Sequence, residues 1–392
     1  MRAQHTHHFL TAFPVYCSVF LSPTHLVLGG GGGASKTGIK NKLRVYDVSE
    51  NRSINLVSEL ELEPGDDSPT SIAANLEAKE QMKNGQNQNC RVFAFKDQKL
   101  GLVGTRGTLV SGDLDDFQKV TALSPDGKFV VAAGTSSFQL LSFPSLEPVA
   151  PPIKTDKEIY DVTFSPNLLV VATTANLLVY ALPGETKSKS SPSKNKKKGK
   201  QKESAAVLSE LELLRTVDAP AGAIGSTGST FRAAKFHPEK PEILYTVSNT
   251  IPARSRTKKA APMQAFVCKW NTATWNADKV RKVGDKGLTC FDISANGSLL
   301  AFGSADCSVG ILDANTLAPL VAILKAHEFP PTTVKFNPTS SLLVSASADN
   351  SIRVIGVPDS AGKTSWGFIM LILITLFIAL LAFAAQQSLL KL

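Results

Sequence analysis

Residues 29–41, GGGGGASKTGIKN, are the segment of this chain whose residue types and spacing come nearest to a chemical motif. The P-loop, GxxxxGK[ST], uses such glycines and a lysine to hold phosphates. Gly30, Lys36 and Thr37 fit that pattern, but Ser35 stands where the second glycine belongs. The following KLRVYDV alternates like a strand, whereas a P-loop leads into a helix whose N-terminus binds the phosphate. We therefore do not expect this loop to bind a nucleotide.

Two interpretations of this glycine loop remain open. Ordering five consecutive glycines costs considerable backbone entropy, so a hairpin would not need them for its stability. In the first interpretation the segment is simply a flexible, solvent-exposed loop. In the second, its exposed carbonyl and amide groups contact a partner, because surface loops on a rigid scaffold often carry binding residues.

The other reactive residue types form no catalytic or metal-binding pattern. The five cysteines, at positions 17, 90, 268, 290 and 307, include no CxxC pair. Their spacing predicts neither a zinc site nor a disulfide framework, and it fits a reducing compartment. No cluster of titratable residues typical of a hydrolase or a kinase is visible, so we expect no covalent catalysis.

The elements that must position the glycine loop are strands. Five copies of a unit with alternating apolar residues and Pro, Asn, Asp or Gly turns begin at VTALSPDG, IYDVTFSPN, FRAAKFHPEK, LTCFDISANG and TTVKFNPTSS. Their spacing of about forty residues is the period of a propeller blade. The copies resemble WD40 repeats, most specifically in the last one, where SASADNSIRV matches the end of a blade and AHEF takes the place of Gly-His.

This pattern predicts an all-β fold, a seven-bladed WD40-like β-propeller. Two weaker N-terminal blades would run from about Phe13 to Val48 and from about Asn55 to Phe117. Six blades remain the alternative. Residues 5–11 are expected to pair with the last blade and close the ring, which removes exposed sheet edges.

The resemblance to WD40 repeats also gives a structural interpretation of three residues with catalytic side chains. In such blades a His and an Asp hydrogen-bond across the blade and hold its turns. His327 and Asp349 stand at these positions, and Asp306 in GSADCSVGIL has the same interpretation.

The C-terminal region contains an uncharged apolar run over residues 366–385. Twenty residues of helix span about 30 Å, which is the thickness of a bilayer core. The sequence therefore predicts a single transmembrane α-helix over 366–385, a cytosolic domain over 1–361 and a short lumenal tail over 386–392. The N-terminus has no pattern of a secretory signal.

The net charge of +9 depends on one segment, KSKSSPSKNKKKGKQK, which holds eight lysines and no acid; without it the chain is near +1. A Ser/Lys tract cannot bury apolar surface, so residues 187–202 are predicted to be a disordered insert. Attraction to the anionic cytoplasmic leaflet is a second interpretation. Nucleic-acid binding is not expected, since no nucleic-acid-binding motif accompanies the charge.

The loop motif GGGG-x-SKTGI-x-N, the divergent propeller and the C-terminal span together resemble a known family, and the resemblance covers nearly the whole chain. This family comprises the endoplasmic-reticulum guanine nucleotide exchange factors for the small GTPase that starts COPII coat assembly. Its animal member is called prolactin regulatory element-binding protein. The resemblance implies an endoplasmic-reticulum membrane protein with a Ras-like GTPase as its partner and no small-molecule substrate.

The resemblance also implies roles for the residues of the loop. A bound potassium ion would organise it, with Asn41 as a ligand. The residues that would shape the loop around that ion are Gly29, Gly30, Gly31, Gly32 and Gly33. The exchange loop that acts on the GTPase would consist of Thr37, Gly38, Ile39 and Asn41.

Exchange of this kind needs no covalent step, because tighter binding of the nucleotide-free GTPase accelerates GDP release. The alternative function is a membrane-tethered WD40 scaffold without exchange activity. A nucleic-acid-binding regulator that uses the lysine tract is a further rival, and the predicted membrane span argues against it.

Overall fold

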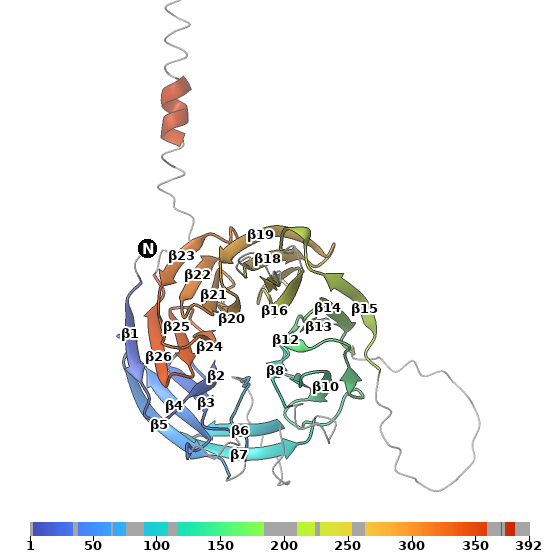
Figure 1. The fold of residues 1–392 in the computed structure, drawn as a ribbon, viewed down its shortest axis with the longest axis vertical. Coiled ribbons are helices and arrows are strands. Elements are labelled where there is room, and N and C mark those ends of the chain that lie inside the picture. Colours follow the sequence, from blue (N-terminus) through green and yellow to red (C-terminus); the bar gives the residue numbers. More distant parts are fainter. Residues whose placement is uncertain are drawn as a thin grey trace, which may run out of the picture. The chain divides into compact units, whose positions relative to one another are not determined.

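A computed structural model describes residues 3–33, 38–63, 66–75, 90–108, 117–183, 210–223, 228–252, 263–358, 370 and 373–380. The chain divides into two compact units, Met1–Pro358 and Asp359–Leu392. In the first unit the described residues form antiparallel sheets that follow one another around a closed ring (Figure 1).

Six of these sheets have four strands, and in five of them the strands follow chain order. The first sheet contains β2 (Val15–Phe20), β3 (His25–Gly30), β4 (Lys42–Val48) and β5 (Ile54–Glu61). The next four-stranded sheets contain β8 (Val120–Leu123), β9 (Phe129–Ala133), β10 (Ser137–Ser142) and β11 (Ile153–Lys154); and β12 (Ile159–Phe164), β13 (Leu168–Thr173), β14 (Asn176–Ala181) and β15 (Leu213–Asp218).

The second half of the ring repeats this plan. A 3₁₀ turn, η1 (Ala221–Ala223), leads to the sheet of β16 (Ser229–Phe236), β17 (Ile243–Thr250), β18 (Ala265–Asn271) and β19 (Asn276–Gly284). The next sheet contains β20 (Leu288–Ile293), β21 (Leu299–Ser304), β22 (Val309–Asp313) and β23 (Pro319–Ile323). The last contains β24 (Pro331–Phe336), β25 (Leu342–Ser347), β26 (Ser351–Gly356) and β1 (His5–Phe9).

The core lies between neighbouring sheets. Strands such as β2 bury most of their residues and leave the others only partly exposed, so each sheet offers apolar side chains to the sheets beside it. One apolar cluster joins Phe13 and Leu26 of the first sheet region to Val344 and Ile352 of the last sheet. Packing between sheets therefore fixes the positions of the loops at the strand ends.

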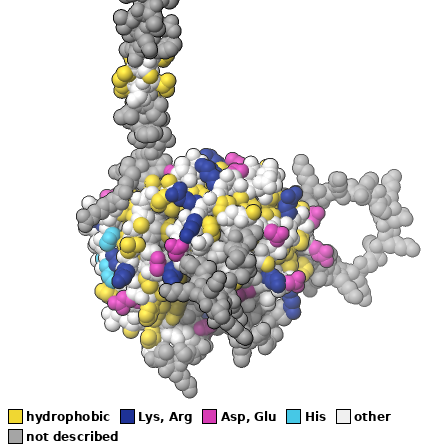
Figure 2. All heavy atoms as spheres, turned by 45° about the horizontal axis from the view of Figure 1, so that its top comes forward, with side chains coloured by type: hydrophobic (Ala, Val, Ile, Leu, Met, Phe, Trp, Pro, Cys, Tyr) yellow, Lys and Arg dark blue, Asp and Glu magenta, His cyan; other side chains and the backbone are white. Residues whose placement is uncertain are grey.

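The N-terminal strand closes the ring, as the sequence predicted. β1 pairs antiparallel with β26, so that His5 lies opposite Ile355 and Phe9 lies opposite Ser351. Figure 2 shows histidine side chains gathered at one edge of the molecule, and β1 carries three of the six in the chain. This pairing makes the last sheet four-stranded.

The prediction of seven blades is wrong for the described residues, which form six four-stranded blades. The remaining strands, β6 (Cys90–Lys96) and β7 (Lys99–Arg106), pair only with each other and occupy the ring between β5 and β8 (Figure 1). SINLVSELEL, assigned to the second blade, supplies β5 and completes the first blade instead. Residues 66–75 form no strand; Thr70 donates from Oγ1 to the Gln118 carbonyl and Ser71 shares a hydrogen bond with Thr121.

The prediction of a transmembrane helix over 366–385 is also wrong as far as the described residues reach. No helix among them is long and apolar enough to cross a membrane. The helical residues described there are 370 and 373–380, and eight residues of helix extend only about 12 Å. The rest of this stretch, the predicted tail over 386–392 and the lysine-rich insert over 187–202 lie outside the described residues.

Candidate functional site

The glycine loop leaves the first blade at the end of β3 and returns at the start of β4. A strand follows the loop, as expected from the sequence, so the helix N-terminus of a P-loop is missing here. Gly30 lies so close to the neighbouring chain that a Cβ atom would stand 2.0 Å from the Pro14 carbonyl oxygen. Gly31 donates its N–H to that same oxygen at 3.0 Å. The first glycines are therefore required by close packing.

Asn41 closes the base of the loop with its side-chain amide. Its Oδ1 accepts the N–H of Gly33 at 2.9 Å, and its Nδ2 donates to the Gly33 carbonyl at 3.2 Å. The same Nδ2 donates to the Asp66 carbonyl at 2.6 Å. Asn41 is buried, and Gly31, with φ of +142°, packs so tightly on it that a Cβ atom would lie 2.3 Å from Oδ1. One side chain thus fixes both ends of the loop.

Asp66 connects this base to the two-stranded sheet. Its carboxylate accepts two hydrogen bonds from the Arg91 guanidinium of β6, at 2.8 and 2.9 Å. Both side chains are mostly buried, so this bidentate pair is a stronger constraint than an exposed ion pair. Glu63 donates its N–H to Asp66 Oδ2 at 3.0 Å, which closes the intervening turn. The loop base is therefore a network of three chain segments.

The thiol beside this base is inert. Cys17 donates from Sγ to the Pro69 carbonyl at 3.3 Å, and burial raises its pKa to about 12. A thiol with such a pKa stays protonated near neutral pH and is neither a nucleophile nor a metal ligand. Cys17 therefore acts as a small packing residue against Gly29, where a Cβ atom would lie 2.5 Å from its sulfur.

The strand that leaves the loop carries a compact charge cluster. Glu59 of β5 accepts hydrogen bonds from Lys42 and, at 2.7 Å, from Arg44 Nε. The hydrogen bond from Lys42 is the main cause that holds the pKa of Glu59 below its usual range, and Arg44 adds to it. Lys40 forms a further ion pair with Glu61 at 2.6 Å. The exposed pair of Lys40 and Glu61 contributes little to stability, whereas Lys42 and Arg44 are partly buried against Glu59.

The structure brings together part of the predicted site. The glycines from Gly29 to Gly33 and Asn41 meet at the base of the loop, as described above. Gly38, with φ of +76°, is exposed and Ile39 is half-buried on the returning arm of the loop. Thr37 lies outside the described residues. Asp66 and Arg91 were not predicted, because no spacing or motif links positions 25 residues apart in different segments.

The oxygen atoms at the base of the loop are of the type that could bind a cation. They are the Gly33 and Asp66 carbonyls and Asn41 Oδ1, which are neutral ligands suited to a hard cation. The Asn41 amide already bridges the two carbonyls, so the described loop base is closed by hydrogen bonds. Among the described residues, no group of three or more His, Cys, Asp or Glu is arranged to hold a metal ion.

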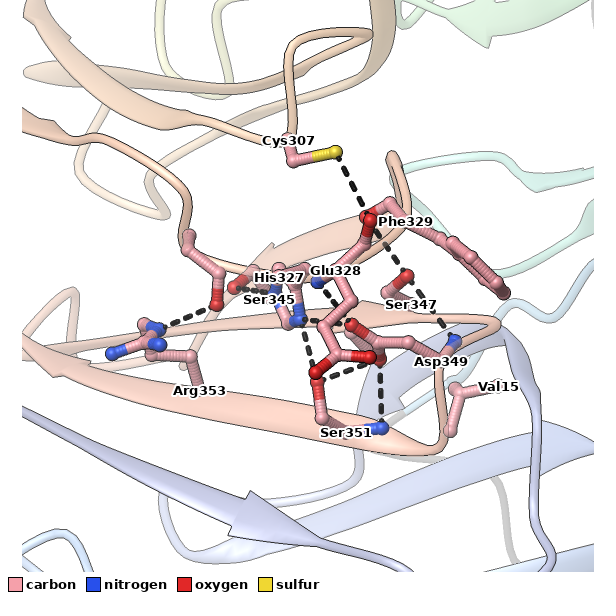
Figure 3. Close-up of polar contacts among 12 residues, drawn as sticks. Val15, Cys307, His327, Glu328, Phe329, Ser345, Ser347, Asp349, Ser351 and Arg353 are labelled. Carbon is pink, nitrogen blue, oxygen red and sulfur yellow. Dashed lines mark hydrogen bonds and ion pairs between the residues drawn. The ribbon is translucent and has the colours of Figure 1, made fainter.

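The histidine and aspartate of the last blade have the structural role predicted for them. His327 is buried and hydrogen-bonds through Nδ1 with Ser351 and through Nε2 with Ser345, both at 2.8 Å (Figure 3). Asp349 accepts the N–H of Glu328 at 2.7 Å and the hydroxyl of Ser351 at 2.6 Å. Burial lowers the pKa of His327 to about 4, although the nearby Asp349 acts in the opposite direction. The imidazole is therefore a neutral link between β25, β26 and the loop before β24.

Asp306 has the same local role in the preceding blade. Its Oδ1 accepts the N–H of Ser308 at 3.0 Å as well as the Ser308 hydroxyl. These bonds outweigh its partial burial and hold its pKa below the usual range. Asp306 therefore stabilises the turn between β21 and β22.

Comparison with known proteins identifies relatives along almost the whole chain. The family model "WD domain, G-beta repeat" matches residues 318–355, which run from β23 almost to the end of β26. "Guanine nucleotide-exchange factor SEC12" of Candida glabrata is 24% identical over 96% of this chain and 78% of its own length. The SEC12 exchange factor of Rattus norvegicus is 23% identical over 92% of both chains.

A solved structure supports the fold alone. Chaetomium thermophilum Raptor matches with a TM-score of 0.58 and 13% identity, over 91% of this chain and 29% of its own. The chain is similar to the SEC12 exchange factors over nearly its whole length.

Proposed function

We propose that this protein is a guanine nucleotide exchange factor for the small GTPase that initiates COPII coat assembly. The observation that carries the proposal is the glycine loop, whose base Asn41 fixes on a rigid propeller in a chain related to named exchange factors over 96% of its length. Function resides in such a site and not in the propeller fold, which many unrelated proteins share.

Exchange at this loop would be a binding process without bond making. The base, held by Asn41 and Asp66, is the stiff support, and Gly38 and Ile39 lie on the arm that would contact the GTPase. Switch segments around a bound nucleotide are kept in place by few local contacts, so a wedge against them releases the nucleotide. The factor accelerates release only to the extent that it binds the nucleotide-free GTPase more tightly than the GDP-bound form.

We also propose that a potassium ion organises the loop, with Asn41 Oδ1 and the glycine carbonyls as its ligands. The ion would add positive charge at the loop base and stiffen the glycine backbone. The neutral oxygens gathered at Asn41 support this proposal. A requirement for potassium in place of sodium is its direct consequence.

The partners and location follow from the same proposal. The protein would bind a Ras-like GTPase, act on no small-molecule substrate and work at the endoplasmic reticulum, where COPII coats form. Subcellular fractionation with endoplasmic-reticulum markers tests the location independently of exchange.

The test is release of fluorescent GDP from the purified COPII GTPase by the full chain, in potassium and in sodium buffer. Wild type should accelerate release in potassium, while Ile39→Ala and Asn41→Ala should lose most of the acceleration. Leu213→Ala, an exposed apolar residue on β15, is the matched control and should behave as wild type. A well-folded wild type that binds the GTPase without accelerating release would indicate a scaffold and overturn the proposal.

A further inference from the structure

Exposed large apolar side chains in the loops of the propeller are sorted to one face. Because neighbouring strands are antiparallel, the loops that enter the first strand of each blade and the loops between its second and third strands lie on the same face. The glycine loop between β3 and β4 is on this face. So are the exposed Leu, Ile, Met and Phe residues at strand ends and in loops of the described propeller: Phe9, Phe117, Ile251, Met263, Leu324 and Phe329.

The opposite face of the propeller differs in how it exposes large apolar side chains. Among the described residues, the other exposed side chains of this kind in the propeller are Leu56 and Leu102, within strands β5 and β7, and Leu213 and Leu214, the first two residues of β15, which begins at the opposite face. None lies in the described loops of the opposite face. The side drawn in Figure 2 intersperses apolar and charged side chains. The face that exposes more large apolar groups is the better candidate for a contact with a protein.

Hydrogen bonds hold the backbone of Phe329 and its two neighbours in place. Its side chain is 57% exposed, and it points away from the hydrogen-bond network below it (Figure 3). Ser347 donates from Oγ to the Phe329 carbonyl at 3.1 Å and to the Pro330 carbonyl at 3.2 Å. Asp349 accepts the N–H of the preceding Glu328 at 2.7 Å. An aromatic side chain held in advance of binding loses little conformational entropy in a complex.

A short chain of contacts connects Phe329 to the glycine loop. Thr332, three residues after Phe329, donates from Oγ1 to the Val15 carbonyl at 2.7 Å. The residue before Val15 is Pro14, whose carbonyl accepts the N–H of Gly31. The last blade is therefore connected to the base of the loop through the start of β2.

We propose that the GTPase docks on this face with Phe329 as an anchor beside the exchange loop, an inference that rests on the proposed function. A specific complex buries about 800 Å² on each partner, far more than a loop tip of a few residues provides. The remaining contact area must come from surface continuous with the loop. Phe329 supplies the kind of residue that dominates such interfaces, a rigid aromatic group that loses its exposure to water.

The loop and the anchor should make different contributions. The loop acts on the nucleotide site and sets the maximal exchange rate. Phe329 contacts the GTPase in every bound state, so it sets affinity. Uniform binding of this kind changes the concentration dependence and leaves the rate at saturation unaltered.

The experiment measures binding and exchange separately for the full-length wild type, Phe329→Ala, Phe329→Tyr and Leu213→Ala. Binding of the nucleotide-free GTPase is measured by biolayer interferometry, and GDP release is measured over a range of factor concentrations. Phe329→Ala should raise the Kd and the half-maximal concentration about tenfold or more, the loss typical of an anchor residue, with an unchanged maximal rate. Phe329→Tyr should recover most of the affinity, and Leu213→Ala should match wild type.

The outcomes distinguish this inference from the proposed function. Normal exchange by wild type with unchanged affinity in Phe329→Ala would overturn the anchor and leave the function standing. Binding that depends on Phe329 without any acceleration of release would support the anchor and overturn the exchange function. Absence of binding by wild type would overturn both.

Discussion

Replacing Asn41 by alanine should open the glycine loop while the propeller stays folded. The substitution removes three hydrogen bonds, to the Gly33 N–H, the Gly33 carbonyl and the Asp66 carbonyl. Each is worth about 1 kcal/mol net, and a buried group left without its partner costs about the same or more. Because Gly33 is only half-buried, water replaces part of the loss. We expect the loop to be destabilised by about 2–3 kcal/mol.

Hydrogen exchange of the Gly33 amide reports this change directly, because a loop can open without global unfolding. A loss of 2–3 kcal/mol corresponds to about thirty- to hundredfold lower protection, since about 1.4 kcal/mol is tenfold. Amides of β13, in a distant blade, are the internal reference and should keep their protection. Unchanged protection at Gly33 would refute the assignment of Asn41 as the residue that closes the loop.

The substitution Asn41→Asp keeps the shape of the side chain and replaces its amide with a carboxylate. The carboxylate still accepts the Gly33 N–H, but it faces the Gly33 and Asp66 carbonyls without a hydrogen to donate. In sodium buffer it should therefore lose at least as much protection as Asn41→Ala. If a cation binds at Asn41 Oδ1, potassium should restore protection of the Gly33 amide in Asn41→Asp. It should not restore that protection in Asn41→Ala. Equal behaviour in the two salts would count against the cation.

Two further predictions concern the propeller. The pKa of His327 is lowered to about 4 in the folded chain, against about 6.5 in the unfolded chain. The unfolded chain therefore binds the proton more readily, and the folded state loses stability as the pH falls from about 6.5 towards 4. The total loss should be about 3 kcal/mol. Urea unfolding at a series of pH values checks this, and a His327→Gln curve parallel to that of wild type would contradict it. Asp292→Ala should cost about 2–4 kcal/mol, because the carboxylate pairs with Lys335 of the next blade at 2.8 Å and accepts the Phe336 N–H at 3.0 Å. Asp292→Asn retains an acceptor for the Phe336 N–H and should lose less in the same urea titration. An equal loss in both variants would show that this hydrogen bond contributes nothing and that the ion pair accounts for the loss.

The sequence predicted strands well and their partners less well. The alternation in VYCSVF and in SINLVSELEL identifies each as a strand, because period-two burial is local information. Which blade a strand joins depends on the turn before it. Here Ser49 donates its N–H to the Ser53 carbonyl and folds β5 back onto β4. Both segments alternate alike, so the pattern alone could not assign β5 to the first blade.

The sequence predicted the residues of the loop motif but not all of the contacts that hold the loop. Consecutive glycines and the later Asn41 were visible as a motif, and the structure joins them through the amide of Asn41. The bidentate pair of Asp66 and Arg91 was not visible, because it depends on how two segments without a shared pattern meet in space. The apolar run over 366–385 predicted more helix than the described residues contain, since hydropathy measures composition and not helix length.

The pairing of β1 with β26 has a consequence for the order of events during synthesis. His5 of β1 is synthesised near the start of the chain, and its partner Ile355 of β26 is synthesised near the end. The fourth strand of the last blade is therefore made first, and the strands beside it are made last. Closing so long a loop is entropically slow, and contacts of this separation delay folding. Pro14, which accepts the Gly31 N–H, follows directly after that first strand. A nascent chain that stops before β26 therefore leaves β1 without its partner strand and the ring unclosed.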